Sequence, residues 1–587
     1  MSTNKLFNTQ GRLEILDQVT KEGLLSLEKA NIRGNEYFVF KEAPNNLREY
    51  YQLGLLHGDW THIVYQEERF QFNDTLKITS QLANTLQAKF NIQKGDRVAF
   101  SMRNYPEWMF CYMAITSIGG VVVPLNSWWK GDEIEYGLTN SEAKLFIGDE
   151  ERLDRLEGRL SDLPKISVRS SKSEHQDIDF YKLIKDQSET LDNPVEIDPE
   201  DDASIMYTSG STGYPKGVVL THRGIIFAPF YWILLTTMVK EASDEETLAL
   251  EQANEEEQAA SLVGVPLFHV TGSHALFLLS IPVGRKTVLM YKWDPDIALD
   301  LVEQEKITAF TGVPTMSAEM VEAQIKNPRD ISTLKDLYGG GAPRPPEQVK
   351  KQKEHMPETN PGIGYGLTET NALGANNAGD TYLAKPMSTG FPVPKIIELK
   401  IVDDDGNTLE TNENGEVCIK SAATFRCYWK NPEATQDCLD SQGWFKTGDI
   451  GYLDEDGFLF INDRKKDMVI RGGENIACPE VEAAIAEHPD VLEASVFGVP
   501  DERLGEILAT NVCVRDESKL NDTDLNSFLA TKLANFKIPA HIWIQKDKLP
   551  RIASGKIAKK DLRASAIKLL GKYCLLYTSD AADDDHC

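Results

Sequence analysis

A loop rich in glycine and hydroxyl residues is the strongest chemical signal in the sequence. It runs from Tyr207 through Thr-Ser-Gly-Ser-Thr-Gly-Tyr-Pro-Lys to Gly217, between two short apolar runs. Its glycines let backbone N–H groups approach an anion, its hydroxyls add donors, and Lys216 supplies a positive charge. It is not a Walker A loop, because the spacing of glycine and lysine differs. A lone glycine loop is more often a surface turn, but eleven consecutive residues of this character favour phosphate binding.

Alternating helices and strands are expected to position this loop. Apolar residues at Ile78, Leu82, Leu86 and Phe90 have helical spacing, and a glycine turn then leads into an apolar run. The same alternation recurs later in the chain. Further helices are predicted over 108–118, 132–136 and 296–305, and strands over 98–100, 121–123, 145–147, 287–290 and 307–310. This order predicts an α/β fold with mainly parallel sheets that are covered by helices.

Antiparallel hairpins replace the alternation after Glu398. The paired runs are 399–402 with 416–419, and 450–453 with 458–461. Turns rich in Asp and containing Gly lie between the runs, which is typical of hairpins. An antiparallel sheet is therefore expected beside the parallel ones.

A small α+β unit is predicted at the end of the chain. Pro479 opens a helix whose Val481, Ala484 and Ile485 share one face, and a strand follows at 494–497. The predicted organisation is a large domain over 1–463, a hinge at 464–467, a small domain over 468–573 and a tail at 574–587. The composition of that tail fits two interpretations: a non-native segment, such as a translated vector sequence, or a native acidic tail. We predict a non-native or disordered tail.

Composition restricts the classes of function. The 587 residues include 62 basic and 91 acidic side chains, which gives a formal net charge of −29 at pH 7. Such a charge repels nucleic acid, so no nucleic-acid partner is expected. The eight cysteines show no CxxC pair and no metal-binding spacing, which favours free thiols. We find no signal peptide or membrane-spanning run and expect a cytoplasmic protein, or a peroxisomal one if the native C-terminal residues are missing.

Further sequence blocks, in a fixed order, resemble the adenylate-forming superfamily of acyl- and aryl-CoA synthetases, peptide-synthetase adenylation domains and luciferases. The resemblance extends from about Asp96 to Arg563. After the phosphate loop, the blocks are Pro266–Gly272, Gly339–Pro343, Gly364–Thr370, Lys446–Asp449, Asp463–Asp467, Arg471–Asn475 and Pro550–Lys556. The resemblance implies α/β subdomains with parallel sheets, a distorted antiparallel β barrel and a small mobile C-terminal domain. It also implies that ATP and Mg²⁺ activate a carboxylic acid as acyl-AMP, with release of pyrophosphate, before the acyl group passes to CoA.

The resemblance assigns roles at an ATP site. Thr368 and Glu369 would contact the α-phosphate and Mg²⁺, and Thr212 is the second residue implied at the metal. Tyr365 would lie along adenine, and Asp449 would accept both ribose hydroxyls. The residues implied at ATP or AMP are Thr208, Ser209, Gly210, Ser211, Thr212, Gly213, Lys216, Gly340, Gly341, Ala342, Gly364, Tyr365, Gly366, Leu367, Asp449 and Arg464.

Other implied residues belong to a moving domain. Lys556 would bridge the acid and the α-phosphate, and would leave when the small domain rotates at the hinge residue Lys466. Its charge should matter for adenylation and little for thioester formation. The residues that would then face CoA are Arg471, Gly472, Gly473 and Glu474.

The acid is predicted to be apolar. The run 224–235 is bulky and apolar, which suits a pocket for an apolar acid. His269 follows Phe268, at the position where peptide-synthetase domains usually carry Asp. His269 could also gate the same pocket. Gly366-Leu367 replaces the double tryptophan of acetate-specific relatives, which points to larger acids. We expect a medium- to long-chain fatty acid first and an aryl or cinnamyl acid second. A catalytically silent, nucleotide-binding regulator is the alternative from a different class of function. The sequence leaves open whether the protein forms a homodimer.

Overall fold

A seven-stranded sheet carries the strands on both sides of the predicted phosphate loop. The computed structural model describes residues 5–208, 215–243 and 258–580. The strand order is β19 (Cys427–Tyr428), β10 (Lys216–Thr221), β9 (Asp202–Thr208), β6 (Val121–Pro124), β5 (Arg97–Ser101), β7 (Leu145–Asp149) and β8 (Lys165–Val168). From β9 to β8 the strands are parallel, whereas β10 and β19 are antiparallel additions. The loop therefore follows the carboxyl end of β9, where α/β sheets usually bind ligands.

Helices link the strands of this sheet. They are α3 (Phe72–Phe90), α4 (Pro106–Ser117), α5 (Gly131–Ser141), α6 (Glu150–Asp154), η3 (Ser173–Ile178) and α7 (Phe180–Ile184). In α3, Gln71 and Asp74 form a capping box at the start, and Asn91 ends the helix in the left-handed conformation. Every residue of α4 is buried, because its sequence is apolar on all sides. The predicted helix–strand alternation is confirmed.

An eight-stranded sheet lies beside the first. Its order is β16 (Gly374–Ala378), β15 (Asn360–Gly366), β14 (Asp336–Gly340), β13 (Ala309–Gly312), β11 (Ala260–Val263), β12 (Lys286–Leu289), β3 (Thr61–Tyr65) and β4 (Glu68–Gln71). The six inner strands are parallel, and both edge strands are antiparallel. The connecting helices are α8 (His222–Ala242), η4 (Thr271–Leu278), α10 (Leu279–Val283), α11 (Pro295–Glu305), α12 (Pro314–Lys326), α13 (Pro346–His355), η5 (Thr368–Thr370) and α14 (Gly379–Ala384).

Helix α8 is long and apolar. Within the described residues it alone meets the length and hydropathy expected of a membrane span, but half of that window is buried inside the protein. Phe227 and Phe230 pack against Phe40 at ring-centroid distances of 5.1 and 5.5 Å. This packing is typical of a core helix of a globular protein.

Smaller elements frame the two sheets. The N-terminal part contains η1 (Lys5–Phe7), α1 (Thr9–Val19), β1 (Leu27–Ile32), β2 (Asn35–Phe40), α2 (Leu47–Tyr51) and η2 (Gln52–Leu56). A four-stranded antiparallel sheet has the order β17 (Glu398–Val402), β18 (Gly415–Lys420), β20 (Phe445–Leu453) and β21 (Leu459–Arg464), with α15 (Pro432–Cys438) inserted before β20. Both predicted hairpins are present in it. The order is that of an open sheet where the resemblance implied a barrel.

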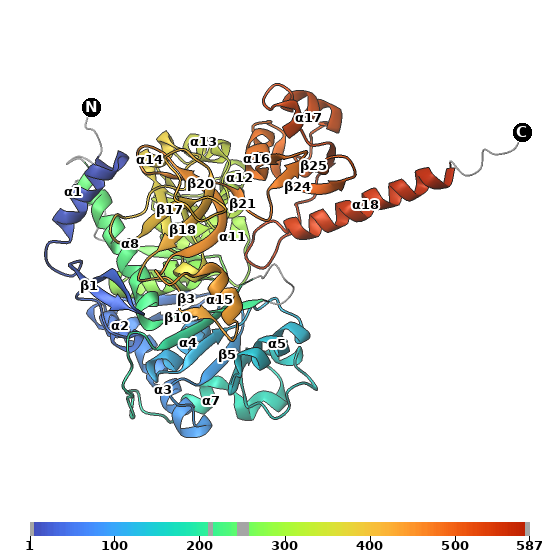
Figure 1. Ribbon diagram of the computed structural model, residues 1–587. Coiled ribbons are helices and arrows are strands. Elements are labelled where there is room, and N and C mark those ends of the chain that lie inside the picture. The colour runs from blue at the N-terminus through green and yellow to red at the C-terminus, as the bar shows by residue number, and fades with distance from the viewer. Residues whose placement is uncertain (1–4, 209–214, 244–257, 581–587) are drawn as a thin grey trace, which may run out of the picture.

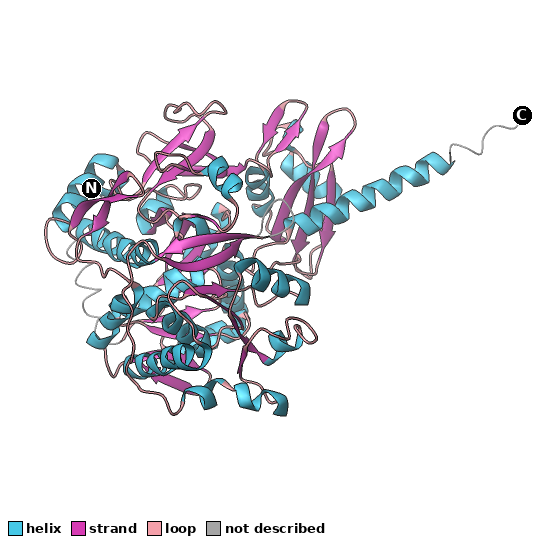
Figure 2. Ribbon diagram, turned by 60° about the horizontal axis from the view of Figure 1, so that its bottom comes forward, coloured by secondary structure: helices cyan, strands magenta, loops and turns pink. Residues whose placement is uncertain are grey.

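The C-terminal domain is an α+β unit, drawn in orange and red at one side of Figure 1. Its elements are β22 (Val469–Arg471), β23 (Glu474–Ile476), α16 (Cys478–Ala486), β24 (Val491–Asp501), β25 (Gly505–Val514), α17 (Asp522–Leu529), η6 (Asn535–Lys537), β26 (His541–Gln545) and α18 (Lys559–Asp580). The predicted apolar face of α16 is buried. Figure 2 shows α18 extending away from the rest of the molecule.

Ion pairs join this domain to helix α12. Arg515 lies 3.1 and 3.2 Å from the two carboxylate oxygens of Glu322. Lys548 lies 2.7 Å from Glu319. These contacts hold the loop that carries Lys556 against the eight-stranded sheet in this conformation.

Candidate active site

Asp449 forms the centre of a small polar cluster. The Tyr365 hydroxyl on β15 donates to Oδ2 of Asp449 over 2.7 Å, and Nε of Arg464 lies 3.3 Å from Oδ1. Asp449 is only 4% exposed. Burial raises the pKa of Asp449, whereas the Arg464 charge and the Tyr365 hydrogen bond lower it. The structure thus brings together three residues that the sequence predicts at one nucleotide site.

Lys556 reaches this cluster from the C-terminal domain. A Cβ atom on Gly341 would lie 3.2 Å from Cε and Nζ of Lys556, so a side chain at 341 would crowd the lysine. Gly341 also has φ +72°, which favours glycine. Burial lowers the pKa of Lys556 to about 8; Arg464 lowers it as well, and Asp449 opposes the shift. The lysine predicted from the end of the chain therefore lies at the predicted Gly339–Pro343 block.

Glu369 lies on the short helix η5, close to the end of the phosphate loop. The Tyr428 hydroxyl donates to Oε1 of Glu369 over 2.7 Å. Nζ of Lys216 lies 4.9 Å from the centroid of the Tyr428 ring. Burial raises the pKa of Glu369, and the hydrogen bond from Tyr428 and the charges of Arg464 and Lys216 lower it. Glu369 and Lys216, far apart in sequence, thus meet around one tyrosine.

Glycines on β14 and β15 allow close backbone packing beside these groups. Gly340 pairs with Gly364 in the register of β14 and β15. A Cβ on Gly366 would lie 2.2 Å from the carbonyl oxygen of Ala372, which excludes any larger residue. The predicted neighbours Ala342, Leu367 and Thr368 lie at the ends of these strands.

His269 is a partly buried ring near Lys556. Burial lowers the pKa of His269 to about 3, and the charge of Lys556 lowers it further. At neutral pH the ring is therefore uncharged, so it can contribute a neutral donor or acceptor but no cation.

The roles of several other predicted residues are not tested by this cluster. Ser209, Gly210, Ser211, Thr212 and Gly213 fall outside the described residues, so their roles stay predictions. Lys466 is exposed between β21 and β22. The four residues expected to face CoA form a tight, exposed turn between β22 and β23, in which Gly472 and Gly473 have φ +60° and +93° and Arg471 pairs with Glu474. Their roles also stay predictions.

The predicted acyl-pocket run 224–235 contributes mainly to the core. Residues 225–231 of α8 are all buried. Ile226 and Phe227 also line a small cavity beside Phe40, and the role of the run as a wall of the acyl pocket stays a prediction. Nearer to Lys556, Val313 and Met316 contact the position of Gly555.

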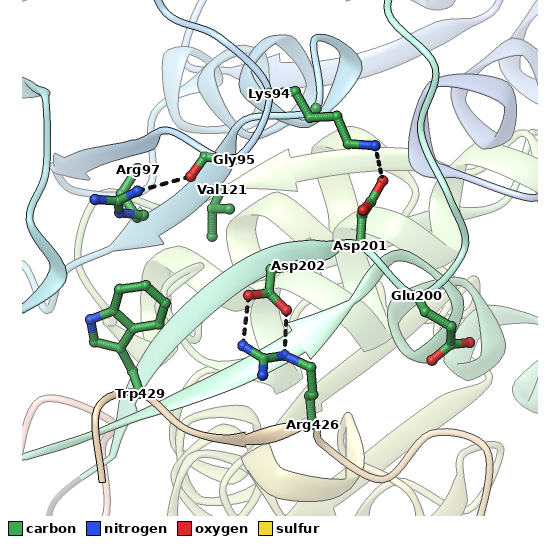
Figure 3. A pocket seen from close by; sticks show the side chains of 10 residues that line it. Lys94, Gly95, Arg97, Val121, Glu200, Asp201, Asp202, Arg426 and Trp429 are labelled. Carbon is green, nitrogen blue, oxygen red and sulfur yellow. Dashed lines mark hydrogen bonds and ion pairs between the residues drawn. The ribbon is translucent and has the colours of Figure 1, made fainter. Parts of the chain in front are cut away.

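A cavity of about 320 Å³ lies at the amino-terminal ends of the central strands of the seven-stranded sheet (Figure 3). It is lined by the residues that begin β5, β6 and β9, whereas the phosphate loop follows the other end of β9. Its charges neutralise one another: Lys94 lies 2.6 Å from Asp201, and Arg426 forms two bonds of 2.6 and 2.8 Å with Asp202. We assign no chemistry to this cavity, because no lining charge is left to recognise a ligand.

A divalent cation fits the cluster only with help from a ligand. Among residues 5–208, 215–243 and 258–580, no group of three or more His, Cys, Asp or Glu could hold a metal ion. Glu369 supplies one hard carboxylate, and Mg²⁺ commonly binds through one or two carboxylates together with phosphate oxygens. The donor set therefore suits Mg²⁺ that arrives with a nucleotide.

The six described cysteines are free thiols, as predicted: Cys111, Cys418, Cys427, Cys438, Cys478 and Cys513.

Sequence reasoning missed Tyr428. No local pattern marks it, because its partner Glu369 lies 59 residues earlier in the chain. An aromatic residue just before a proline-opened helix is too common a signal to identify it. Only the register of β19 against β10 shows which side chains it meets.

The pH dependence of the cluster can be predicted from Lys556. Because burial lowers the pKa of Lys556 to about 8, the lysine loses its positive charge as the pH rises through that value. We expect kcat/KM for pyrophosphate release without CoA to fall over the same range. Any activity that Lys556→Arg retains should lack this decline, because a guanidinium stays charged. A wild-type profile that stays level up to the ordinary lysine range would contradict the assignment.

A large α/β body and a C-terminal domain both contribute residues to this polar cluster. The sequence profile of AMP-binding enzymes matches residues 55–429, and that of the AMP-binding enzyme C-terminal domain matches residues 480–556. The chain belongs to the AMP-binding enzyme family, and it is an AMP-forming acid–thiol ligase.

Known proteins similar to this chain act on different acids. A long-chain-fatty-acid–CoA ligase of Bacillus subtilis is 32% identical, covering 86% of this chain and 91% of its own. A 4-coumarate–CoA ligase of Arabidopsis thaliana is 29% identical, covering 87% and 89%. The crystal structure of the anthranilate–CoA ligase AuaEII with anthranoyl-AMP is 25% identical with a TM-score of 0.79, covering 90% and 99%. The relatives are thus divided between fatty and aromatic acids.

Proposed function

We propose that this protein activates a medium- to long-chain fatty acid with ATP and transfers the acyl group to CoA. The observation that carries the proposal is the position of Lys556. A lysine of the C-terminal domain lies against Gly341, within electrostatic reach of Asp449 and Arg464. A carboxylate and a phosphate repel each other, so their reaction needs a cation that both can contact. Lys556 is well placed to provide it.

Each remaining group has a role in the same reaction. We infer that Asp449 accepts the ribose hydroxyls, with Tyr365 and Arg464 holding its carboxylate in place. Lys216 stands at the end of the loop that would hold the leaving phosphates. Glu369 would hold Mg²⁺, which when bound would neutralise phosphate charge. These residues orient ATP and offset its charge.

Transfer to CoA requires a second arrangement. The ion pairs of Glu322 and Glu319 with the C-terminal domain keep Lys556 in place, so we infer that they break when that domain rotates at Lys466. The exposed Arg471–Glu474 turn would then reach the site, and its two glycines would leave room for the pantetheine arm of CoA.

The peroxisomal alternative has no support in the names of the relatives and is not carried forward.

The choice of a fatty acid rests on the apolar residues near Lys556 and on the fatty-acid relative. Val313 and Met316 approach Gly555, and burial leaves His269 uncharged. An aryl or cinnamyl acid is the second candidate, because the 4-coumarate relative matches over a similar share of the chain.

A panel of acids tests this proposal. Pyrophosphate release would be measured with ATP, Mg²⁺ and acids from acetate through long fatty acids to cinnamates, with and without CoA. We expect the highest kcat/KM with medium or long fatty acids and stimulation by CoA. A preference for cinnamates would replace the fatty acid with the second candidate. Silence across the panel, with ATP still bound, would instead favour a nucleotide-binding regulator.

A further inference from the structure

Tyr428 lies between two elements of the proposed ATP site. It belongs to the two-residue strand β19, in which Tyr428 pairs with Val218 of β10. On one side its hydroxyl donates to Oε1 of Glu369 over 2.7 Å, and on the other its ring lies 4.9 Å from Nζ of Lys216. No sequence block of the family resemblance contains Tyr428.

The segment around Tyr428 is tied to both neighbours through the backbone. The Phe425 N–H donates to the carbonyl oxygen of Glu369 over 2.7 Å. The Trp429 N–H donates to the carbonyl oxygen of Gly217 over 2.7 Å. The segment therefore joins the start of β10 to the η5 turn, and Tyr428 cannot move independently of either.

The hydrogen bond from Tyr428 makes the two oxygens of Glu369 unequal. Oε1 accepts the phenol proton, whereas no other described side chain donates a hydrogen bond to Oε2. Glu369 is only 8% exposed, but Oε2 is not among the fully enclosed side-chain atoms that lack a partner, so a ligand can reach it. Oε2 is thus the oxygen available to a cation.

We propose that Tyr428 is a positioning residue that fixes Glu369 so that Oε2 faces a nucleotide-bound divalent cation. Its ring also keeps Lys216 at the end of the phosphate loop. The proposal rests on the ATP-binding function proposed above. It goes further in naming the group that orients the metal-binding carboxylate and the oxygen that binds the metal.

A fixed carboxylate should bind a cation more tightly than a freely rotating one. Without the phenol, Glu369 can rotate and place either oxygen elsewhere, so part of the binding energy would go into ordering it. The charge-assisted hydrogen bond itself would also be lost. The cation should therefore bind less tightly, while contacts to the base and ribose stay as they are.

Tyr428→Phe tests this inference, because it removes one oxygen and keeps the ring beside Lys216. Free Mn²⁺ would be measured by electron paramagnetic resonance in the presence of saturating α,β-methylene-ATP. We expect Mn²⁺ affinity to fall by about 10- to 100-fold, the range for a hydrogen bond to a charged group. Affinity for AMP without metal, measured by calorimetry, should stay unchanged. In turnover, the Mg²⁺ concentration for half-maximal pyrophosphate release should rise, with the KM for the acid unaltered.

Tyr452→Phe is the matched control. Tyr452 stacks on Phe460 in the four-stranded sheet with ring centroids 4.8 Å apart, away from Glu369. Its loss of a hydroxyl should leave Mn²⁺ affinity at the wild-type value. A second measurement uses Glu369→Gln, in which adding Tyr428→Phe should cause little further loss of Mn²⁺ affinity, because both changes remove one interaction.

The outcomes separate this inference from the proposed function. If wild-type protein binds Mn²⁺ with the nucleotide but Tyr428→Phe binds it equally well, Tyr428 does not position Glu369. Fully additive losses in the double variant would overturn the inference as well. If the wild type itself binds no nucleotide and releases no pyrophosphate, the proposed function fails first.

Discussion

Replacing Lys556 by Ala should separate the two halves of the reaction. We expect acid-dependent pyrophosphate release to fall by about 100- to 1,000-fold, the loss typical when one group that stabilises transition-state charge is removed. Thioester formation from synthetic acyl-AMP and CoA should change by less than about threefold, because we infer that Lys556 has left the site with the rotated C-terminal domain before that step. Pyrophosphate release would be followed with a coupled assay, and acyl-CoA by chromatography.

Lys560→Ala is the matched control for this experiment. Lys560 is an exposed lysine four positions further along the same domain, and it should tolerate the change without loss of either half-reaction. Equal losses in both half-reactions of Lys556→Ala would mean that the lysine supports the fold or both steps. That result would contradict its assignment to adenylation.

Replacing Arg169 by Met should cause a large loss of stability. Arg169 follows β8 and donates to Glu107 on α4 over 3.0 Å and to Glu68 on β4 over 2.9 and 2.6 Å. Its guanidinium lies beside the contacting rings of Tyr65 and Tyr105, at 5.0 Å from each centroid. This network joins the seven-stranded sheet to the eight-stranded one.

Glu107 explains the expected size of the effect. Its side chain is fully buried, and burial raises the pKa of Glu107 while the charge of Arg169 lowers it. Without Arg169, the carboxylate would keep one described side-chain donor, the Tyr181 hydroxyl at 2.9 Å. We expect the free energy of unfolding to fall by about 3–5 kcal/mol, as when one partner of a buried ion pair is removed. Urea unfolding followed by tryptophan fluorescence would measure the change.

Arg159→Met provides the comparison. Arg159 pairs with Asp132 and Glu135 at the surface, where ion pairs contribute about 0–1 kcal/mol. Adding Glu107→Gln to Arg169→Met should recover part of the lost stability, because the unpaired buried charge is then gone. Equal losses for Arg169→Met and Arg159→Met would show that the buried network does not stabilise the protein.

Local patterns were enough to predict many of the elements. The spacing of Ile78, Leu82 and Leu86 predicts α3 because one face of that helix packs on the core. The aspartate- and glycine-rich turn at 454–457 predicts the β20–β21 hairpin because its backbone needs a positive φ, found at Gly457. In both cases the signal lies within a few residues of the element.

Long-range pairing was beyond the reach of such patterns. β3 and β4, from early in the chain, lie at the edge of the eight-stranded sheet beside β12, and no local feature of their sequence specifies that position. The same holds for Tyr428, whose role depends on strand register. The apolar character of the run 224–235 predicts a pocket wall; Phe227 and Phe230 pack against Phe40 in the core, and the pocket role stays a prediction.

Some features of the candidate site could be predicted from the sequence, and others could not. Lys216, Glu369, Asp449, Arg464 and Lys556 could all be named from the sequence because the family resemblance assigns them roles, and the structure brings them near one another. Their hydrogen-bond partners and shifted pKa values depend on burial, which the sequence does not reveal. The resemblance therefore predicts which residues gather, and the fold decides how each one is held.

Product analysis tests the central assignment most directly. The protein would be incubated with ATP, Mg²⁺ and a fatty acid without CoA, and the products would be measured by mass spectrometry and ion-exchange chromatography. We expect acyl-AMP and pyrophosphate in equal amounts, followed by acyl-CoA and AMP once CoA is added. ADP and phosphate as the nucleotide products, or pyrophosphate release that does not depend on the acid, would contradict an AMP-forming acid–CoA ligase.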